Sequence, residues 1–312
     1  MKKILLGIII ALTSSTTLAK NISVVIPFSA GGGTDRAWRL LHSMIQPDLK
    51  KDQIDLVTEY RPGAGGALGV SYVANTADQS TNFLFASSAM SIAPAANPGS
   101  VKYQPQDFQM LGYFGAFPLA LFVPTMGADN MKNFIQACRS RSLNFSSTGT
   151  GSTTHSVIET MLKKINCSAV AVYYKGTPPM VPDLISGRID FAVDFVTGPF
   201  SPMVQDRKAK NIMVIGRRRL ATLPDVPASS EYDIHLDEFK SWQVFLVNAK
   251  ANVDDVSRVQ KSVTRALSQP ENINKFRDIG LDGAGERVST NFLADNFSFY
   301  RRFFIENNLV EK

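Results

Sequence analysis

A strand that runs directly into a glycine-rich turn and then into a helix is the feature that most constrains this chain. The apolar run from Ile22 to Ile26 stops at Pro27, and three glycines follow at positions 31–33. Thr34 is the expected N-cap of the helix, with Asp35 in its first turn. The predicted buried face of this helix carries Ala37, Leu40, Leu41, Met44 and Ile45. Uncovered glycine amides before a helix N-terminus predict an anion-binding loop.

A second segment, from Leu143 to His155, has the same order of elements. A short strand is followed by a turn of Gly, Thr and Ser residues, and then by a helix. The apolar face of that helix is predicted to carry Ile158, Met161, Leu162 and Ile165. Two such loops could face each other across a cleft and bind one anion from both sides. Tight turns that bind nothing are common in α/β proteins, so this alternative stays open for each loop.

The N-terminal segment 1–19 has the pattern of a secretory signal peptide. Lys2 and Lys3 precede an apolar run from Ile4 to Leu12, and small residues around Ala19 predict cleavage there. The run is too short for a membrane span. We therefore expect an exported protein that begins near Lys20.

Charge and length exclude some classes of protein. The net charge is +6, of which Lys2 and Lys3 supply two, so the rest of the chain is only mildly basic. The one dense basic cluster, Arg217 to Arg219, lacks interleaved aromatic residues, and we predict no nucleic-acid partner. Roughly 290 residues after cleavage exceed what one core usually holds, so two lobes are expected.

Strands and helices alternate along the chain, which predicts largely parallel sheets flanked by helices. We expect a polar loop at Ser87–Ser91 after a short strand, and a first crossing between lobes near Pro124. A strand from Ile189 should deliver Asp194 to its carboxyl end, where ligands of open α/β sheets collect. Two helices, with inner faces at 256–267 and 293–304, are expected to close the chain.

Cys138 and Cys167 are the only cysteines. Each is predicted to follow a helix and precede a strand, which places both at one edge of a sheet. In an oxidising compartment a disulfide between them is possible, and two buried free thiols are the equal alternative.

Motifs of common enzymes are missing from the sequence. Neither glycine loop matches a dinucleotide or Walker pattern, there is no Gly-x-Ser-x-Gly elbow, and three histidines supply a zinc site poorly. Ser152 and His155 could form a nucleophile pair, but helix capping is the favoured interpretation, and Ser156 with Glu159 is itself a capping-box pattern. We predict no enzyme, no cofactor and no metal. An exported hydrolase and a ligand-sensing partner of a membrane histidine kinase remain the alternatives.

Several short motifs occur together and in order. They are Pro-Phe-x-Ala-Gly-Gly-x-Thr-Asp from Pro27, Arg-Pro-Gly-Ala-Gly-Gly from Arg61, Tyr-Lys-Gly from Tyr174, Leu-Pro-Asp-Val-Pro from Leu223, and Ser241-Trp242. In these motifs the chain resembles the Bug family, the TctC-like periplasmic receptors of tripartite tricarboxylate transporters. Ser29, Tyr173 and Gln243-Val244 depart from the usual family pattern, which bears on the return hinge and on the identity of the ligand.

The resemblance implies an α/β type II periplasmic-binding-protein fold, with two Rossmann-like lobes around a central ligand cleft. Lobe 1 would comprise residues 20–123 and 245–312, and lobe 2 residues 124–244. The implied function is a monomeric solute-binding receptor that captures a small carboxylate, such as a di- or tricarboxylate, for the membrane permease subunits of the transporter.

The resemblance also implies ligand-binding residues. The first loop contributes Phe28, Ala30, Gly31, Gly32, Thr34 and Asp35; the second contributes Thr148, Gly149, Gly151, Ser152, Thr153 and His155; the selectivity positions are Ser87, Tyr174 and Asp194. Because Asp35 and Asp194 would repel a bare anion, we expect them to accept from a ligand amino or hydroxyl group or to orient water. For Asp35 a plain first-turn acid is an equal alternative, and for Asp194 a partner inside its own lobe.

Overall fold

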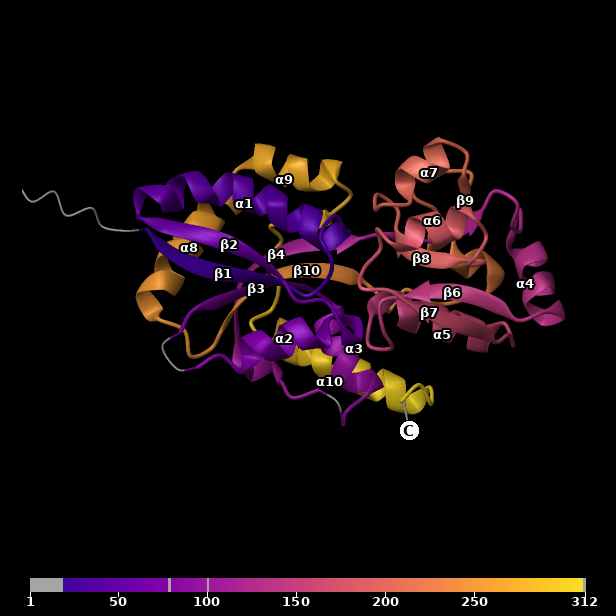
Figure 1. Cartoon of the computed structure of the whole chain (residues 1–312), viewed down its shortest axis with the longest axis horizontal. Helices are drawn as coiled ribbons and strands as arrows, with labels where there is room; N and C mark the ends of the chain where they lie inside the picture. Colours follow the sequence, from indigo (N-terminus) through magenta and orange to yellow (C-terminus); the bar gives the residue numbers. More distant parts are fainter. Residues whose placement is uncertain (1–18, 78–79, 100, 311–312) are drawn as a thin grey trace, which may run out of the picture.

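The computed structural model describes residues 19–77, 80–99 and 101–310. Two α/β lobes lie side by side along the long axis of the molecule (Figure 1). The expected signal peptide falls on residues 1–18, which lie outside the described ranges. None of the helices in the described ranges is both long and apolar enough to cross a bilayer.

The first lobe is built on a six-stranded sheet with the order β11-β4-β10-β3-β1-β2. Its strands are β1 (Lys20–Ile26), β2 (Ile54–Tyr60), β3 (Asn82–Ser87), β4 (Phe108–Phe117), β10 (Ser241–Asn248) and β11 (Asp282–Ala284). β1 is parallel to β2 and β3, but β10 is antiparallel to both β3 and β4, and β11 is antiparallel to β4. The expectation of a largely parallel sheet is therefore wrong. β4 leads out of this lobe and β10 leads back into it, so the two strands must run in opposite directions.

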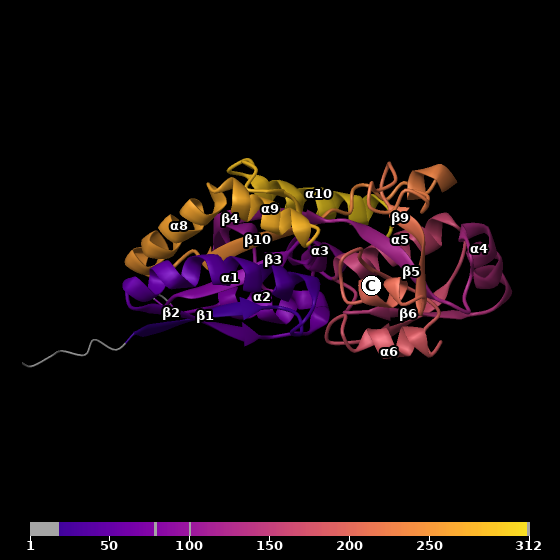
Figure 2. The ribbon, with the colours of Figure 1, turned by 90° about the horizontal axis from the view of Figure 1, so that it is seen from above.

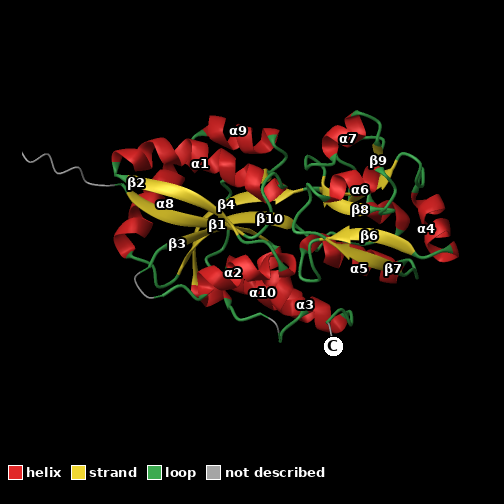
Figure 3. Ribbon diagram, viewed as in Figure 1, coloured by secondary structure: helices red, strands yellow, loops and turns green. Residues whose placement is uncertain are grey.

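Helices cover both faces of this sheet (Figure 3). One face is covered by α1 (Gly33–Lys51), α8 (Val253–Leu267) and α9 (Pro270–Asp278), and the other by α2 (Ala67–Ala74), α3 (Ala89–Ala96) and α10 (Phe292–Glu306), with short 3-10 turns η1 (Ala64–Gly66) and η2 (Pro105–Asp107). Aromatic rings fill the first core, where Trp38 stacks on Phe245 with ring centroids 5.5 Å apart. Helix α9 was not predicted from the sequence. Only Asn272 and Phe276 are buried in it, so it shows no apolar periodicity.

The second lobe contains the strands β5 (Leu119–Pro124), β6 (Leu143–Ser147), β7 (Ala169–Tyr173), β8 (Ala192–Phe195) and β9 (Ala209–Ile215). β5 lies between β8 and β9 and is antiparallel to both, while β6 and β7 form a parallel pair. A bridge between Phe145 and Phe191 connects that pair to the start of β8. The helical elements are α4 (Met131–Ser140), α5 (Thr153–Lys164), α6 (Met180–Ile185), α7 (Ser201–Gln205) and the 3-10 turn η3 (Ser229–Tyr232).

Strand pairing shows where the chain changes sheets. β4 and β5 are separated only by Pro118, and the whole of β5 pairs within the second lobe. On the return, β10 pairs with first-lobe strands from Ser241 onward. The expected lobe limits at 123/124 and 244/245 stay predictions, and the pairing places both changes of sheet earlier in the chain.

Candidate functional site

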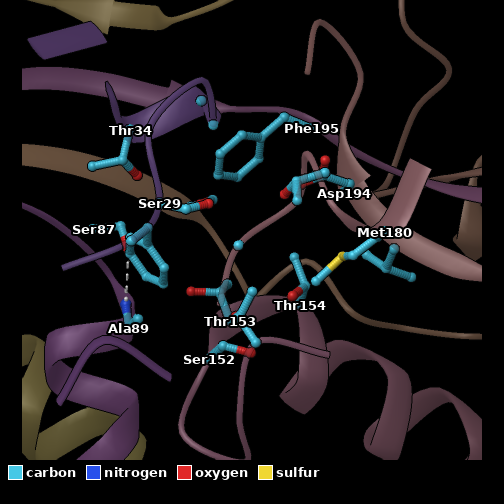
Figure 4. Close-up of a pocket in the computed structure, with 18 residues that line it drawn as sticks. Ser29, Thr34, Ser87, Ala89, Ser152, Thr153, Thr154, Met180, Asp194 and Phe195 are labelled. Carbon is cyan, nitrogen blue, oxygen red and sulfur yellow. Dashed lines mark hydrogen bonds between the residues drawn. The ribbon is translucent and has the colours of Figure 1, made fainter. Parts of the chain in front are cut away.

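A cavity between the lobes receives both glycine-rich loops. From the first lobe it is lined by Phe28, Gly32, Thr34 and Ser87, and from the second by Thr148, Ser152, Thr153 and Asp194. These eight are among the fifteen residues predicted from the sequence. Figure 4 shows Ser29 and Thr34 on one side of this space, Ser152 to Thr154 below it, and Asp194 opposite Ser29. The cavity has a volume of about 50 Å³, so it suits a compact ligand.

The first loop delivers the N-terminus of α1 to the cavity. The N-cap is Gly32, with extended backbone (φ −72°, ψ 173°) and no side-chain cap, so the prediction of Thr34 as N-cap is wrong. Thr34 lies inside the first turn, because the helix already begins at Gly33. A glycine cap leaves the first helical amides without a side-chain acceptor, and they carry the positive end of the helix dipole.

Asp35 holds this loop in place and does not line the cavity. Its carboxylate accepts from the Gly31 amide, the Arg39 Nε and the Tyr60 hydroxyl, each at 2.8 Å. The side chain is 1% exposed. Three donors satisfy the buried charge, so Asp35 acts as a structural acid at the start of α1.

The second loop delivers the N-terminus of α5. Ser152 is the N-cap and its hydroxyl accepts from the His155 amide at 3.3 Å, which confirms the capping interpretation; the capping box at Ser156 and Glu159 is wrong. The His155 ring lies against Ser147, with 2.8 Å between Nδ1 and Oγ, and the Ser147 hydroxyl accepts from the Gly149 amide at 3.0 Å. His155 therefore supports the loop from behind.

Direct contacts close the cleft beside the cavity. The Gly65 amide donates to the Thr148 carbonyl at 3.0 Å, the Ser29 amide donates to the Lys175 carbonyl at 3.1 Å, and the Ser88 and Thr153 hydroxyls lie 2.7 Å apart. Gly149 has φ +127°, and a Cβ there would lie 2.3 Å from the Gly65 nitrogen. Glycine at this position thus permits the two backbones to meet.

The other predicted residues lie off the cavity wall. Ala30 is exposed, Gly31 binds Asp35, and Gly149 and Gly151 pack against Gly65 and Ala93 of the first lobe. The Tyr174 hydroxyl donates to Asp183 at 2.6 Å, and burial together with this bond raises its pKa to about 12. A direct role for these residues in ligand binding stays a prediction.

Sequence reasoning missed several residues of the cavity wall, namely Ser29, Gly33, Ala89, Thr154, Gly176, Thr177, Met180, Val193, Phe195 and Ser241. Ser87 was expected in a loop, but a helix starts at Ala89, so the polar loop at 87–91 is wrong. Helix α3 has no charged residue to mark a polar face and contains Pro94, so its sequence shows no clear helical periodicity. Phe195 could have been found, because it follows Asp194 at the same strand end.

Asp194 has an unusual electrostatic environment. It is 4% exposed, and one carboxylate oxygen, Oδ2, has no hydrogen-bond partner. Burial raises the pKa of Asp194 to about 7, against the opposing effects of the Phe195 amide and the Thr177 hydroxyl. Among the described residues that line the cavity, Asp194 is the only ionisable one.

The two cysteines meet as expected at the edge of the second lobe. Cys138 is buried in the last turn of α4, Cys167 precedes β7, and both thiols are free in the structure. Burial and a hydrogen bond with Cys167 raise the pKa of Cys138 to about 12. A disulfide between them stays a prediction.

Two α/β lobes with helix N-termini facing a shared cavity define a periplasmic-binding-protein architecture. Residues 45–299 match the model of the "Tripartite tricarboxylate transporter family receptor". The chain belongs to this family of substrate-binding receptors.

The chain is also similar to individual proteins in sequence and in structure. A UPF0065 protein of Pseudomonas sp. (strain P51) is 25% identical over 91% of this chain and 87% of its own length, and protein BugT of Bordetella pertussis is 25% identical over 93% and 90%. Among solved structures, the periplasmic binding protein BugD has a TM-score of 0.80 at 23% identity, covering 94% of this chain and 99% of BugD.

Two further structures share the fold and contain carboxylates. MatC of Rhodopseudomonas palustris, with bound malate, has a TM-score of 0.79 at 21% identity over 93% of this chain and 99% of its own. R. palustris Rpa4515, with adipate, has a TM-score of 0.80 at 22% identity over 92% and 95%. At these identities the similarity establishes the fold.

Proposed function

We propose that this protein captures a small carboxylate in the cavity between its lobes and delivers it to the membrane permease of a tripartite tricarboxylate transporter. It would act in the periplasm as a monomer, after cleavage near Ala19. The observation that carries the proposal is the convergence of the α1 and α5 N-termini on one cavity. Malate and adipate in the two related structures support a carboxylate as the ligand class.

Fixed backbone amides can replace the water that hydrates a free carboxylate. A carboxylate at a helix N-terminus accepts charge-assisted hydrogen bonds from backbone N–H groups, and the helix dipole stabilises its charge. No Lys or Arg side chain lines the cavity among the described residues, so the amides and hydroxyls must supply this stabilisation. Each helix is longer than two turns, with 19 residues in α1 and 12 in α5.

Thermal unfolding with matched ligands tests the proposal. Succinate, malate and adipate are compared with the neutral diamide of succinic acid. A ligand at 100 times its Kd stabilises the folded state by about 2.7 kcal/mol, which corresponds to a rise in Tm of about 5 °C. We expect at least one acid to give such a rise and the diamide to give none. Stabilisation by neutral compounds alone would refute the carboxylate assignment.

A receptor returns its ligand unchanged. Mass spectrometry after a long incubation with the stabilising acid should therefore recover that acid intact. Conversion of the acid would instead support an exported enzyme.

A further inference from the structure

We propose that the ligand carries an ammonium group as well as a carboxylate, so that it is a small zwitterionic amino acid whose ammonium binds Asp194. This inference rests on the proposed function, because it assumes that the carboxylate occupies the helix N-termini. It specifies the chemical class of the ligand, and it makes the Asp194 carboxylate the binding partner of the ligand's ammonium group.

The first observation is an incompletely satisfied carboxylate. Asp194 lies at the end of β8, lines the cavity and is 96% removed from solvent, since only 4% of it is exposed. Its Oδ2 has no hydrogen-bond partner among the residues that the structure describes. A buried carboxylate oxygen without a donor is costly, and native proteins pair such groups. A ligand that donates to Asp194 would remove this cost.

Two hydroxyl groups of the cavity wall are also without partners. They are Ser29 Oγ from the first lobe and Ser241 Oγ at the start of β10. Figure 4 shows Ser29 and Asp194 on opposite sides of the same space. An ammonium carries three donors and no acceptor, so it matches a wall that offers one carboxylate and two hydroxyl oxygens.

The charge distribution favours a cation at this end of the cavity. Neighbouring charged groups bind elsewhere: Arg36 donates to the Thr197 carbonyl, and Asp35 pairs with Arg39. On the second lobe, His155 of α5 lies against Ser147, and the strand neighbour of Asp194 on β5 is Ala120. The cavity is also lined by the rings of Phe28 and Phe195, whose faces attract cations. The helix N-termini thus form a positive pole and Asp194 a negative one.

The three ligand classes differ in how they would bind Asp194. An ammonium needs the ionised carboxylate. A second carboxylate on the ligand would need Asp194 protonated, so that it could donate. A hydroxyl group can donate to either form of Asp194, so the affinity of a hydroxy acid should depend only weakly on the charge of Asp194.

The sign of the pH dependence follows from these requirements. With an Asp194 pKa of about 7 in the free protein, an ammonium ligand should bind about tenfold more weakly at pH 6 than at pH 8. A dicarboxylate that needs protonated Asp194 should bind more tightly at pH 6.

Two matched ligand series separate these cases by isothermal titration calorimetry. L-aspartate, L-malate and succinate share one carbon skeleton and differ in bearing an ammonium, a hydroxyl or a hydrogen; L-alanine, L-lactate and propionate do the same on a shorter skeleton. At pH 8 we expect the amino acid to bind at least tenfold more tightly than the unsubstituted acid of its series. At pH 6 the affinity for the amino acid should fall about tenfold.

Asp194→Asn provides the matching variant, since it keeps the shape and removes the charge. Asp194→Asn should weaken binding of the amino acid at least tenfold and abolish its pH dependence. Binding of the unsubstituted acid should stay unchanged or become tighter. Asp206→Asn makes the same charge change at an exposed site, paired with Lys208 at 3.4 Å, and should bind as the natural protein does. The pH series on the unmodified protein decides the question even if Asp194→Asn fails to fold.

Equal or tighter binding of the unsubstituted acid, or tightest binding of the hydroxy acid without pH dependence, would overturn the inference while leaving the carboxylate proposal intact. If no member of either series bound, and no other acid raised the Tm, both proposals would fall.

Discussion

A single substitution at Gly32 can test whether the first glycine-rich loop binds the ligand. It caps α1, lines the cavity and has a backbone conformation open to any residue (φ −72°). The nearest atom to a Cβ at this position would be the Ser29 carbonyl oxygen at 3.6 Å, an ordinary contact. A side chain here would therefore cost the fold little and would occupy ligand space.

Gly32→Val should weaken carboxylate binding at least tenfold, which is about 1.4 kcal/mol, with little change in the Tm of the free protein. The branched side chain would fill part of a cavity of about 50 Å³ and shield the first amides of α1. Calorimetry gives the affinity and thermal unfolding gives the Tm. Gly99→Val, at an exposed turn with only Asn97 Oδ1 within 4.0 Å, is the matched control. Unchanged affinity in Gly32→Val would remove the first loop from the site.

At the scale of elements, the start of α1 and the end of β8 meet in a close contact between the lobes. A Cβ on Gly33 would lie 2.1 Å from the Phe195 ring, which itself stacks on Phe117 with centroids 4.5 Å apart. Gly33 and Phe195 belong to different lobes. Opening of the cleft would separate them.

Gly33→Ala should therefore hinder closure without unfolding either lobe, since alanine is a good helix former. We expect weaker ligand binding and a loss of the ligand-induced decrease in radius of gyration measured by small-angle X-ray scattering. The double variant Gly33→Ala/Phe195→Ala should recover the compaction, because the opposing ring is gone. Normal compaction of Gly33→Ala would show that this contact does not limit closure.

The elements also show what sequence can and cannot predict. Both strand–glycine–helix units were predictable, because hydrophobic periodicity and turn chemistry are local. Helix α1 begins two residues before the expected Asp35, and α5 begins at Thr153, directly after its N-cap Ser152. The direction of β10 was not, since it depends on where the chain re-enters the first lobe. Thr177, Met180 and Ser241 reach the cavity through tertiary packing, so neither hydrophobic periodicity nor turn chemistry places them there.

At the scale of the whole molecule, the lobes are joined by two crossings of the chain and by α10. The crossings lie at Pro118 and before Ser241, and Figure 2 shows α10 extending from the first lobe toward the second. Leu293 packs in a core of the first lobe, whereas Tyr300 and Phe304 pack in the main core of the second. A ligand can shift the balance between open and closed forms only by its differential affinity for them, and a cavity lined from both lobes supplies that difference.

The most direct test of the central claim is a crystal structure with the acid that gives the largest rise in Tm. We predict that its carboxylate oxygens lie about 3 Å from backbone amides at the starts of α1 and α5, in the cavity that contains Gly32 and Thr153. A carboxylate bound elsewhere, with this cavity holding only water, would contradict the account.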